Sequence, residues 1–298
     1  MSIMYDQRSR IGFIGGGKVG GALAVTMARA GHNIVGVSSR TFDSARLISE
    51  RINNCETYHL LQELADHADI VFITTPDDSI ASVVSEIRWN TGQAVIHCSG
   101  AASVSVLITA QQAGALTGAM HPLQALSSID NGIDSIPGTT FGIEANGILK
   151  DYLSDIVYSI GGLPVFINAE DKAIYHLTGV LMGNLLTALG GVSAELWETF
   201  GFTRAEGIKA LVPMMRQVSV NLEKSGLPDA IAGPYVRGDI GTVRNHLEAL
   251  RERAPQYIPL YSELALAGLP FACERGPVTR EIATQIEALL KSYNPSGS

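Results

Sequence analysis

A glycine-rich turn near the start of the chain constrains the fold most strongly. The apolar run Ile11–Ile14 leads into Gly-x-Gly-x-x-Gly, and an apolar helical stretch follows at residues 22–28. In such a unit the first glycine makes a tight turn, the second lets a pyrophosphate approach the backbone, and the third lets the helix pack closely on the sheet. The free N–H groups and positive dipole end of that helix attract phosphate. The pattern predicts dinucleotide binding through Gly15, Gly16, Gly17, Lys18, Val19 and Gly20; the alternative is a glycine-rich turn without a ligand.

The end of the next apolar run indicates which dinucleotide binds. An NAD enzyme usually has an acidic residue here that accepts from the ribose 2′-hydroxyl. This chain has Ser39 and Arg40 instead, and Asp43 comes several residues later. Because arginine makes charge-assisted bonds to phosphate oxygens, the sequence favours NADP(H). The alternative is that Arg40 is a solvated surface residue.

Composition restricts the class of protein. The chain has 298 residues, of which 46% are hydrophobic and 17% charged, enough for two compact domains. Its net charge of −8 makes nucleic acid an unexpected partner. Three cysteines far apart in the sequence form neither a disulfide framework nor a metal-ligand spacing, and residues 1–10 lack the apolar core of a signal peptide. We therefore expect a cytoplasmic protein without a metal.

The order of apolar segments predicts two domains. Strand-like runs at 10–15, 33–38, 69–74, 93–98, 115–120, 139–144 and 163–167 alternate with helical patterns, which predicts a mainly parallel sheet with helices on both faces. Residues 170–292 then read almost entirely as helix, with breaks at Gly201, residues 226–228, 233–234 and 268–270. The expected fold is an α/β N-terminal Rossmann domain at residues 1–168, followed by an all-α C-terminal domain at residues 169–298.

One helical segment imitates a membrane span. Residues 173–194 contain no Asp, Glu, Lys or Arg, over the length that would cross a bilayer. The segment also contains polar residues and several glycines, so we expect a helix buried on all sides within the second domain, or at a homodimer interface.

Polar residues gather where the predicted strands end, which is where open α/β sheets bind ligands. Thr74, Thr75 and Pro76 are expected beside the cofactor, while Asp77 either shares that role or caps a helix. Cys98 is also assigned to the cofactor site, as a packing rather than a reactive residue. Ser99 and Gly100 could approach the cofactor amide or a substrate carboxylate, or could simply form a turn.

His121 is the preferred proton donor. It ends a strand, is followed by a rigid proline and then by Gln124, and histidine titrates near neutrality. The alternative is a histidine that only caps the strand. Within the uncharged helix, Asn184 needs a hydrogen-bond partner, either backbone or substrate, and His176 lies two turns before it. Lys172 reads as a surface lysine.

A break in the helical domain supplies the last site residues. Gly233-Pro234 and Arg237-Gly238-Asp239 interrupt the helical pattern. Arg237 could bind a substrate carboxylate or form an ion pair between helices. Asp239 more simply caps the helix that follows.

Together these segments resemble a bacterial family of Rossmann-like oxidoreductases with a C-terminal domain of unknown function. The resemblance rests on the glycine turn and on Pro76-Asp77-Asp78, His97-Cys98-Ser99-Gly100, His121-Pro122-Leu123-Gln124, Asn184 and Gly233-Pro234-x-x-Arg237-Gly238-Asp239. It extends distantly to pyrroline-carboxylate reductases, ketopantoate reductases and β-hydroxyacid dehydrogenases. It implies an NADP-dependent reductase of a small carboxylate-bearing 2-oxo acid or imine, with a helical domain like that of 6-phosphogluconate dehydrogenase, and a dimer.

The chain departs from the superfamily at one position. The catalytic lysine that hydroxyacid dehydrogenases carry one turn before the helix asparagine is Val180 here. His121, His176 or water would then supply the proton, with the substrate between the two domains. A non-catalytic NADP-binding sensor or interaction protein is the alternative function.

Overall fold

The computed structural model describes residues 5–294, so residues 1–4 of the polar start lie outside the described part. The chain forms two compact units, Met1–Leu185 and Leu186–Ser298, each of which is described by itself. The alternation of strands and helices ends at Phe166, close to the expected border at residue 168. The next helical segment, α8 (Lys172–Val180), belongs nevertheless to the first unit.

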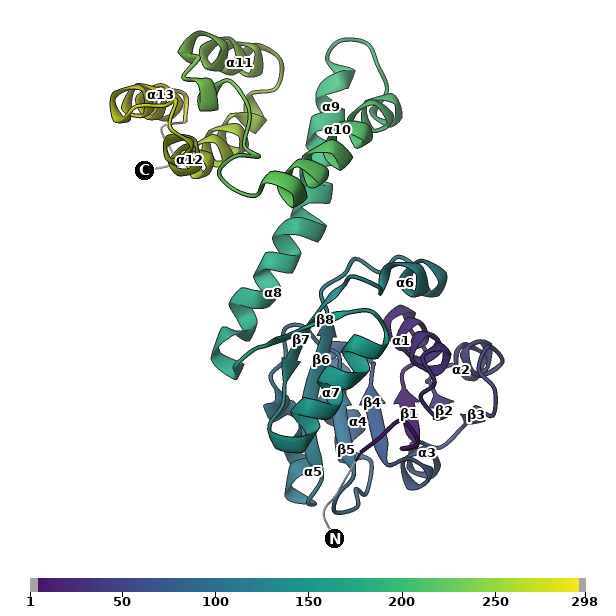
Figure 1. Cartoon of the computed structure of the whole chain (residues 1–298). Coiled ribbons are helices and arrows are strands. Elements are labelled where there is room, and N and C mark those ends of the chain that lie inside the picture. The colour runs from purple at the N-terminus through teal and green to yellow at the C-terminus, as the bar shows by residue number, and fades with distance from the viewer. Residues whose placement is uncertain (1–4, 295–298) are drawn as a thin grey trace. The chain divides into compact units, whose positions relative to one another are not determined.

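The first unit is built on one eight-stranded sheet (Figure 1). Its strands are β1 (Ile11–Ile14), β2 (Ile34–Ser38), β3 (Glu56–Tyr58), β4 (Ile70–Ile73), β5 (Ala94–His97), β6 (Leu116–Pro122), β7 (Thr140–Glu144) and β8 (Leu163–Phe166). They lie in the order β3-β2-β1-β4-β5-β6-β7-β8. The chain order reverses between β1 and β4, and the ends of strands at such a switch point form the ligand crevice of open α/β sheets.

Helices cover both faces of this sheet, as the sequence predicts (Figure 1). One core cluster includes buried residues of α1 (Lys18–Arg29), α2 (Phe42–Ser49), α6 (Ile129–Ser135) and α7 (Gly147–Ser159). The other includes residues of α3 (Leu61–His67), α4 (Ile80–Ser85) and α5 (Ile108–Gln112). The Rossmann architecture of the N-terminal part is thereby confirmed.

Two details of the sheet differ from the sequence prediction. Strand β3 was not predicted, because its three residues are partly polar and too few to show an apolar pattern. Strand β7 pairs antiparallel with β6, with His121 opposite Gly142, and β8 then pairs parallel with β7. Hydrophobic periodicity carries no information on strand direction, so this reversal could not be predicted.

The second unit is entirely helical among its described residues, which confirms the predicted all-α part. Its helices are α9 (Leu186–Glu198), α10 (Arg204–Ser225), α11 (Ile240–Arg253), α12 (Ile258–Arg275) and α13 (Arg280–Tyr293). The predicted break at residues 268–270 is wrong, because α12 continues through Pro270. A proline removes one helical hydrogen bond, but Leu269 and Ala272 on either side are buried and hold the helix in place.

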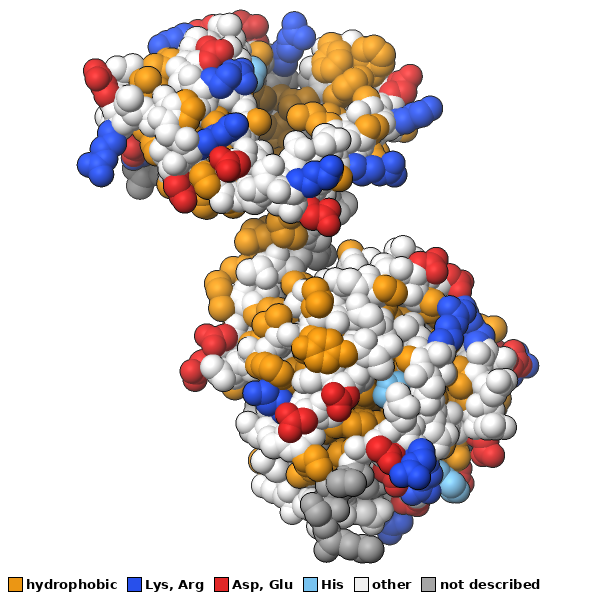
Figure 2. Space-filling model, in the orientation of Figure 1, with side chains coloured by type: hydrophobic (Ala, Val, Ile, Leu, Met, Phe, Trp, Pro, Cys, Tyr) orange, Lys and Arg blue, Asp and Glu red, His pale blue; other side chains and the backbone are white. Residues whose placement is uncertain are grey.

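The uncharged segment is not buried within the chain, which corrects the expectation of a helix enclosed by its own domain. It runs through α8, a π-helical turn at Leu181–Leu185, and α9. Only 6% of its most apolar stretch is buried, and apolar side chains lie open along it (Figure 2). By length and composition alone the helix Ala169–Glu198 could cross a membrane, but one such helix is weak evidence.

Candidate active site

The phosphate-binding turn has the geometry that its glycines predict. Gly15 adopts a φ of +119°, and a Cβ there would lie 2.6 Å from the Thr74 carbonyl carbon. A Cβ on Gly20 would lie 2.3 Å from the Gly15 oxygen, so α1 approaches the turn closely. Gly17 caps α1 without a side-chain hydrogen bond, and a Cβ there would meet no described atom within 4 Å. The first N–H groups of α1 therefore face open space that a phosphate could enter.

Gly20 and Gly17 allow a matched test of the turn. We expect Gly20→Ala to lower the free energy of unfolding of the ligand-free protein by about 1–3 kcal/mol, because its methyl group overlaps backbone. Gly17→Ala should leave that stability within about 0.5 kcal/mol, since the position is exposed and open. It should nevertheless weaken NADPH binding. Urea denaturation and NADPH titration of both variants check this, and unchanged NADPH affinity in Gly17→Ala would remove the turn from the cofactor site.

A cavity of about 480 Å³ opens beside this turn, at the carboxyl ends of the strands. One of its lining residues, Thr75, has a buried hydroxyl without a hydrogen-bond partner among the described residues. Such an orphaned donor fits a site that a polar ligand completes. The residues around the cavity are Gly17, Lys18, Val19, Thr74, Thr75, Pro76, Asp77, Cys98, Ser99, Gly100, His121, Pro122, Gln124, Leu126 and His176.

The residues expected at the 2′-phosphate lie after β2. The Ser39 hydroxyl oxygen is 3.2 Å from where a Cβ of Gly16 would be, which places Ser39 against the phosphate turn. Arg40 is exposed and forms no ion pair within residues 5–294. Its guanidinium is thus available to an anionic ligand.

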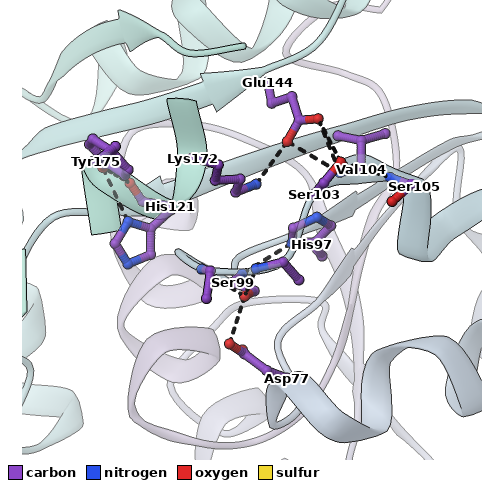
Figure 3. Close-up of polar contacts among 12 residues, drawn as sticks. Asp77, His97, Ser99, Ser103, Val104, Ser105, His121, Glu144, Lys172 and Tyr175 are labelled. Atoms are coloured by element: carbon purple, nitrogen blue, oxygen red, sulfur yellow. Dashed lines mark hydrogen bonds and ion pairs between the residues drawn. The ribbon is translucent and has the colours of Figure 1, made fainter. Parts of the chain in front are cut away.

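Hydrogen bonds of the Ser99 side chain hold the loop after β5 in place (Figure 3). Ser99 donates its hydroxyl proton to Asp77 at 2.7 Å and accepts from the N–H groups of Ala101 and Ala102. This hydroxyl is therefore fully used within the chain, and Asp77 receives it rather than capping a helix. Cys98 is buried in the core, and burial raises the pKa of its thiol to about 12, so it packs as expected.

His97, which the sequence left without a role, is fully buried at the end of β5. Its Nδ1 accepts the Ser99 N–H at 3.1 Å, which places the ring proton of neutral His97 on Nε2. Burial, assisted by the charge of Lys172, lowers the pKa of His97 to about 3. His97 is therefore a neutral support of the loop at physiological pH.

His121 lies on β6 at the centre of the site (Figure 3). Its Nδ1 is 3.1 Å from the Tyr175 hydroxyl, and the His176 ring is edge-on at a centroid distance of 6.0 Å. A Cβ on Gly100 would lie 2.7 Å from His121 Nε2, so only glycine allows this approach. Burial lowers the pKa of His121 to about 4, and the electrostatic effects of His176 and Lys172 add to this shift. The expected titration near neutrality is therefore wrong, because desolvation disfavours the imidazolium.

A second cavity of about 380 Å³ shares His121, Gln124 and His176 with the first. Its other lining residues are apolar or uncharged: Leu123, Ala125, Thr178, Gly179, Val180, Met182, Gly183 and Asn184. The Gln124 amide already bonds to the Ser135 carbonyl and the Thr139 hydroxyl. The cavity at the phosphate turn thus adjoins, at these shared residues, a second cavity of the size of a small organic molecule.

Asn184 differs from its predicted environment. It is exposed rather than buried, and within the described chain its amide makes no hydrogen bond. It lies in the π-helical turn, a local widening that is frequent at functional sites. The side chain is therefore available to a ligand in the second cavity.

The expectation that Lys172 is a surface lysine is wrong, because the residue is only 3% exposed. Its Nζ lies 3.0 Å from Glu144 Oε2 (Figure 3). Sequence reasoning also missed Glu144 and Tyr175. Glu144 ends a predicted strand and could have been suspected on that ground, whereas Tyr175 gives no signal in the sequence.

Arg237 and Asp239 belong to the second unit. Asp239 caps α11, accepting the Thr242 N–H at 3.0 Å and its hydroxyl at 2.6 Å, which confirms the capping role. Arg237 is exposed and makes no ion pair with any described residue, so the suggested pairing between helices is not observed.

Comparison with known families agrees with this architecture. Residues 2–122 match the Rossmann-like domain, and residues 139–267 match a domain of unknown function, DUF2520. The chain therefore combines a Rossmann-like domain with a DUF2520 domain, which confirms the family resemblance drawn from its sequence. No curated protein matches the chain in sequence.

Solved structures share the fold over most of the chain. A candidate NADP oxidoreductase from Bacteroides fragilis is 22% identical, with a TM-score of 0.71 over 89% of this chain and 99% of its own. A Thermotoga maritima protein is also 22% identical, with a TM-score of 0.73 over 88% of this chain and 99% of its own. The 1-pyrroline-5-carboxylate reductase of Streptococcus pyogenes is 17% identical, with a TM-score of 0.59 over 97% and 100%. At these identities the likeness establishes the fold.

Proposed function

We propose that the protein is an NADP(H)-dependent oxidoreductase that reduces a C=O or C=N group of a small molecule. One observation carries this proposal: the cavity beside the phosphate turn and a second cavity of about 380 Å³ share His121 and His176 in their walls. A dinucleotide in the first cavity and a substrate in the second would meet at these histidines. NADPH, when bound, supplies the hydride, and His176 or water would supply the proton that the reduced oxygen or nitrogen takes up.

The residues around the first cavity fit this cofactor. The backbone at Gly15–Gly20 and the N-terminus of α1 suit a pyrophosphate, and the unpartnered Thr75 hydroxyl offers a further hydrogen bond. Ser39 and Arg40 suit a 2′-phosphate. Solved structures of similar fold include a reductive aminase from Aspergillus terreus with NADPH and a Plasmodium falciparum pyrroline carboxylate reductase with NADP. The cofactors bound in these two structures support NADP(H) as the cofactor here.

In this proposal His121 acts as a neutral hydrogen-bonding group. With its Nδ1 beside the Tyr175 hydroxyl, its Nε2 lies beside Gly100 and would bond to the group to be reduced. A neutral imidazole can donate a hydrogen bond that polarises a carbonyl or stabilises a developing negative charge. Asn184 would orient the substrate from the π-helical turn that follows α8. We propose His176 as a second group beside the reacting atoms, and Gly100 as the close backbone approach that leaves them room.

The substrate class remains that of the sequence prediction, a carboxylate-bearing 2-oxo acid or cyclic imine. No Lys or Arg lines the second cavity among the described residues, and Lys18 at the first would face the cofactor phosphates. We propose Arg237, which is exposed and makes no ion pair among the described residues of its own unit, as a carboxylate-binding residue. An Arg237→Ala variant tests this by a raised KM for acids relative to their amides.

The function is tested by titrating the protein with NADPH, and then by following NADPH oxidation with a panel of 2-oxo acids and cyclic imines. Tight NADPH binding and turnover of one substrate class support the reductase. Tight binding without turnover of any compound would instead support a non-catalytic NADP-binding protein, which Val180 at the usual lysine position favours. Failure to bind NADPH would refute both.

We also propose a cytoplasmic homodimer formed through the exposed helices. Ile174, Leu177 and Met182 on the uncharged segment are 44–64% exposed, and apolar side chains of α10 such as Met214 and Val218 are similarly open. Covering such surface is what obligate interfaces do. Sedimentation at micromolar concentration tests this proposal, which a monomer would contradict.

A further inference from the structure

The buried ion pair of Lys172 and Glu144 lies outside both cavities, yet it joins three segments that surround the histidine site. Lys172 is the first residue of α8, which carries Tyr175 and His176 one turn later. Glu144 is the last residue of β7, the strand that pairs with β6 and places Gly142 opposite His121. Their side chains are 4% and 14% exposed, at an Nζ–Oε2 distance of 3.0 Å.

Glu144 also holds the loop after β5. Its Oε1 accepts the Ser103 hydroxyl at 3.1 Å, and both carboxylate oxygens lie 3.2 Å from the Val104 N–H. This loop begins with Cys98, Ser99 and Gly100, which line the first cavity. One carboxylate thus fixes three segments relative to each other: β7, the loop after β5, and the start of α8 (Figure 3).

We propose that Lys172 and Glu144 are positioning residues, which set Tyr175 and His176 against His121 and hold a positive charge behind the site. This proposal rests on the proposed function, since it assigns these residues to the reaction at His121. A surface pair would be a poor means of doing so, because exposed ion pairs contribute little. A buried pair is costly to form, and so its presence here needs a reason beyond stability.

The charge has a direct consequence for the histidines. The groups facing His121 are Tyr175 and His176 from α8, Lys172 from the start of that helix, Asp77 from the 3₁₀ turn after β4, and His97 from β5. Lys172 is the lysine of this set; burial lowers its pKa, and the hydrogen bond and charge of Glu144 oppose that shift. A nearby positive charge disfavours the imidazolium, so the ammonium helps burial to keep His121 and His97 neutral.

Replacing the lysine by an isostere without charge tests both parts of the proposal. In Lys172→Met the pKa of His121 should rise, because the neighbouring cation is gone. Its titration can be followed by ¹H–¹³C NMR of the histidine rings, which requires neither cofactor nor turnover. We also expect kcat to fall roughly tenfold to a hundredfold through misplacement of α8, with little change in NADPH affinity.

Two further variants keep the test decisive. Lys172→Met combined with Glu144→Gln removes both charges at similar volume, so it should fold even if Lys172→Met, with its isolated buried carboxylate, does not. Lys291→Met removes one partner of an exposed pair of 2.6 Å with Glu287 and serves as the control. The double variant should reproduce the upward pKa shift and the loss of kcat, whereas the control should match the native protein.

The outcomes separate this inference from the proposed function. If the double variant unfolds more easily but retains the native His121 titration and kcat, the ion pair is merely structural and the inference is overturned. If the native protein neither binds NADPH nor turns over, the proposed function fails, while the histidine titration still decides the electrostatic part of this inference.

Discussion

Replacing His121 by alanine is expected to lower kcat by about 10²–10³-fold, the usual loss when one preorganised hydrogen-bond donor is removed from a reacting group. NADPH affinity should change little, because the phosphates and the 2′-phosphate lie at the turn and at Arg40. Steady-state kinetics beside a direct NADPH titration measures the two effects separately. Native turnover in His121→Ala would show that His176 or water acts in its place.

His121→Asn is the informative companion to this variant. The asparagine amide can occupy the position of Nδ1 beside Tyr175, but it cannot reach the position of Nε2 at the cavities. If Nε2 acts on the substrate, His121→Asn should be as impaired as His121→Ala. Native activity in His121→Asn, with loss in His121→Ala, would assign the role to the contact with Tyr175.

The pH dependence follows from the lowered pKa of His121. The neutral ring predominates above a pKa of about 4, so activity that depends on it should be lost only as the pH falls through that value. Between pH 5 and 8 His121 should contribute no inflection to kcat. An acid limb near 6.5 that disappears in the His121 variants would contradict the neutral role.

The elements of the fold that could be predicted are those determined by the sequence pattern of neighbouring residues. The glycine turn after β1 and the buried strands gave the Rossmann sheet, because both are dictated within a few residues. The direction of β7 and the existence of β3 depend on pairing between distant segments. The continuation of α12 through Pro270 depends on burial of its neighbours, which no local pattern reveals.

The site residues likewise fall into those that local sequence predicts and those that depend on tertiary contacts. Residues at or just after the ends of strands, such as Thr75, Ser99 and His121, could be placed from sequence because the ends of parallel strands share one edge of the sheet. The burial of Lys172 could not, since lysine is almost always solvated and its partner Glu144 lies far away in sequence. The neutral state of His121 likewise results from tertiary desolvation.

Reversing the charge of Arg40 should have the largest effect on cofactor choice. In Arg40→Asp the charge-assisted hydrogen bonds to the 2′-phosphate are lost and a repulsion is gained, which together should weaken NADPH binding by about 3 kcal/mol, or roughly a hundredfold. NADH lacks the phosphate, so its affinity should stay constant or rise as the new carboxylate accepts from the ribose hydroxyl. Fluorescence titration with both nucleotides gives the ratio of affinities directly.

Arg88→Asp is the matched control, because it changes the net charge equally at another exposed arginine. Arg88 lies between α4 and β5, where the chain enters the sheet, and therefore at the edge opposite the strand ends that carry Arg40. Any weakening of NADPH binding that arises only from the more negative protein should appear in both variants and diminish with salt. A loss confined to Arg40→Asp assigns the 2′-phosphate to this guanidinium, whereas equal affinity of the native protein for NADH and NADPH would show that Arg40 is only a surface residue.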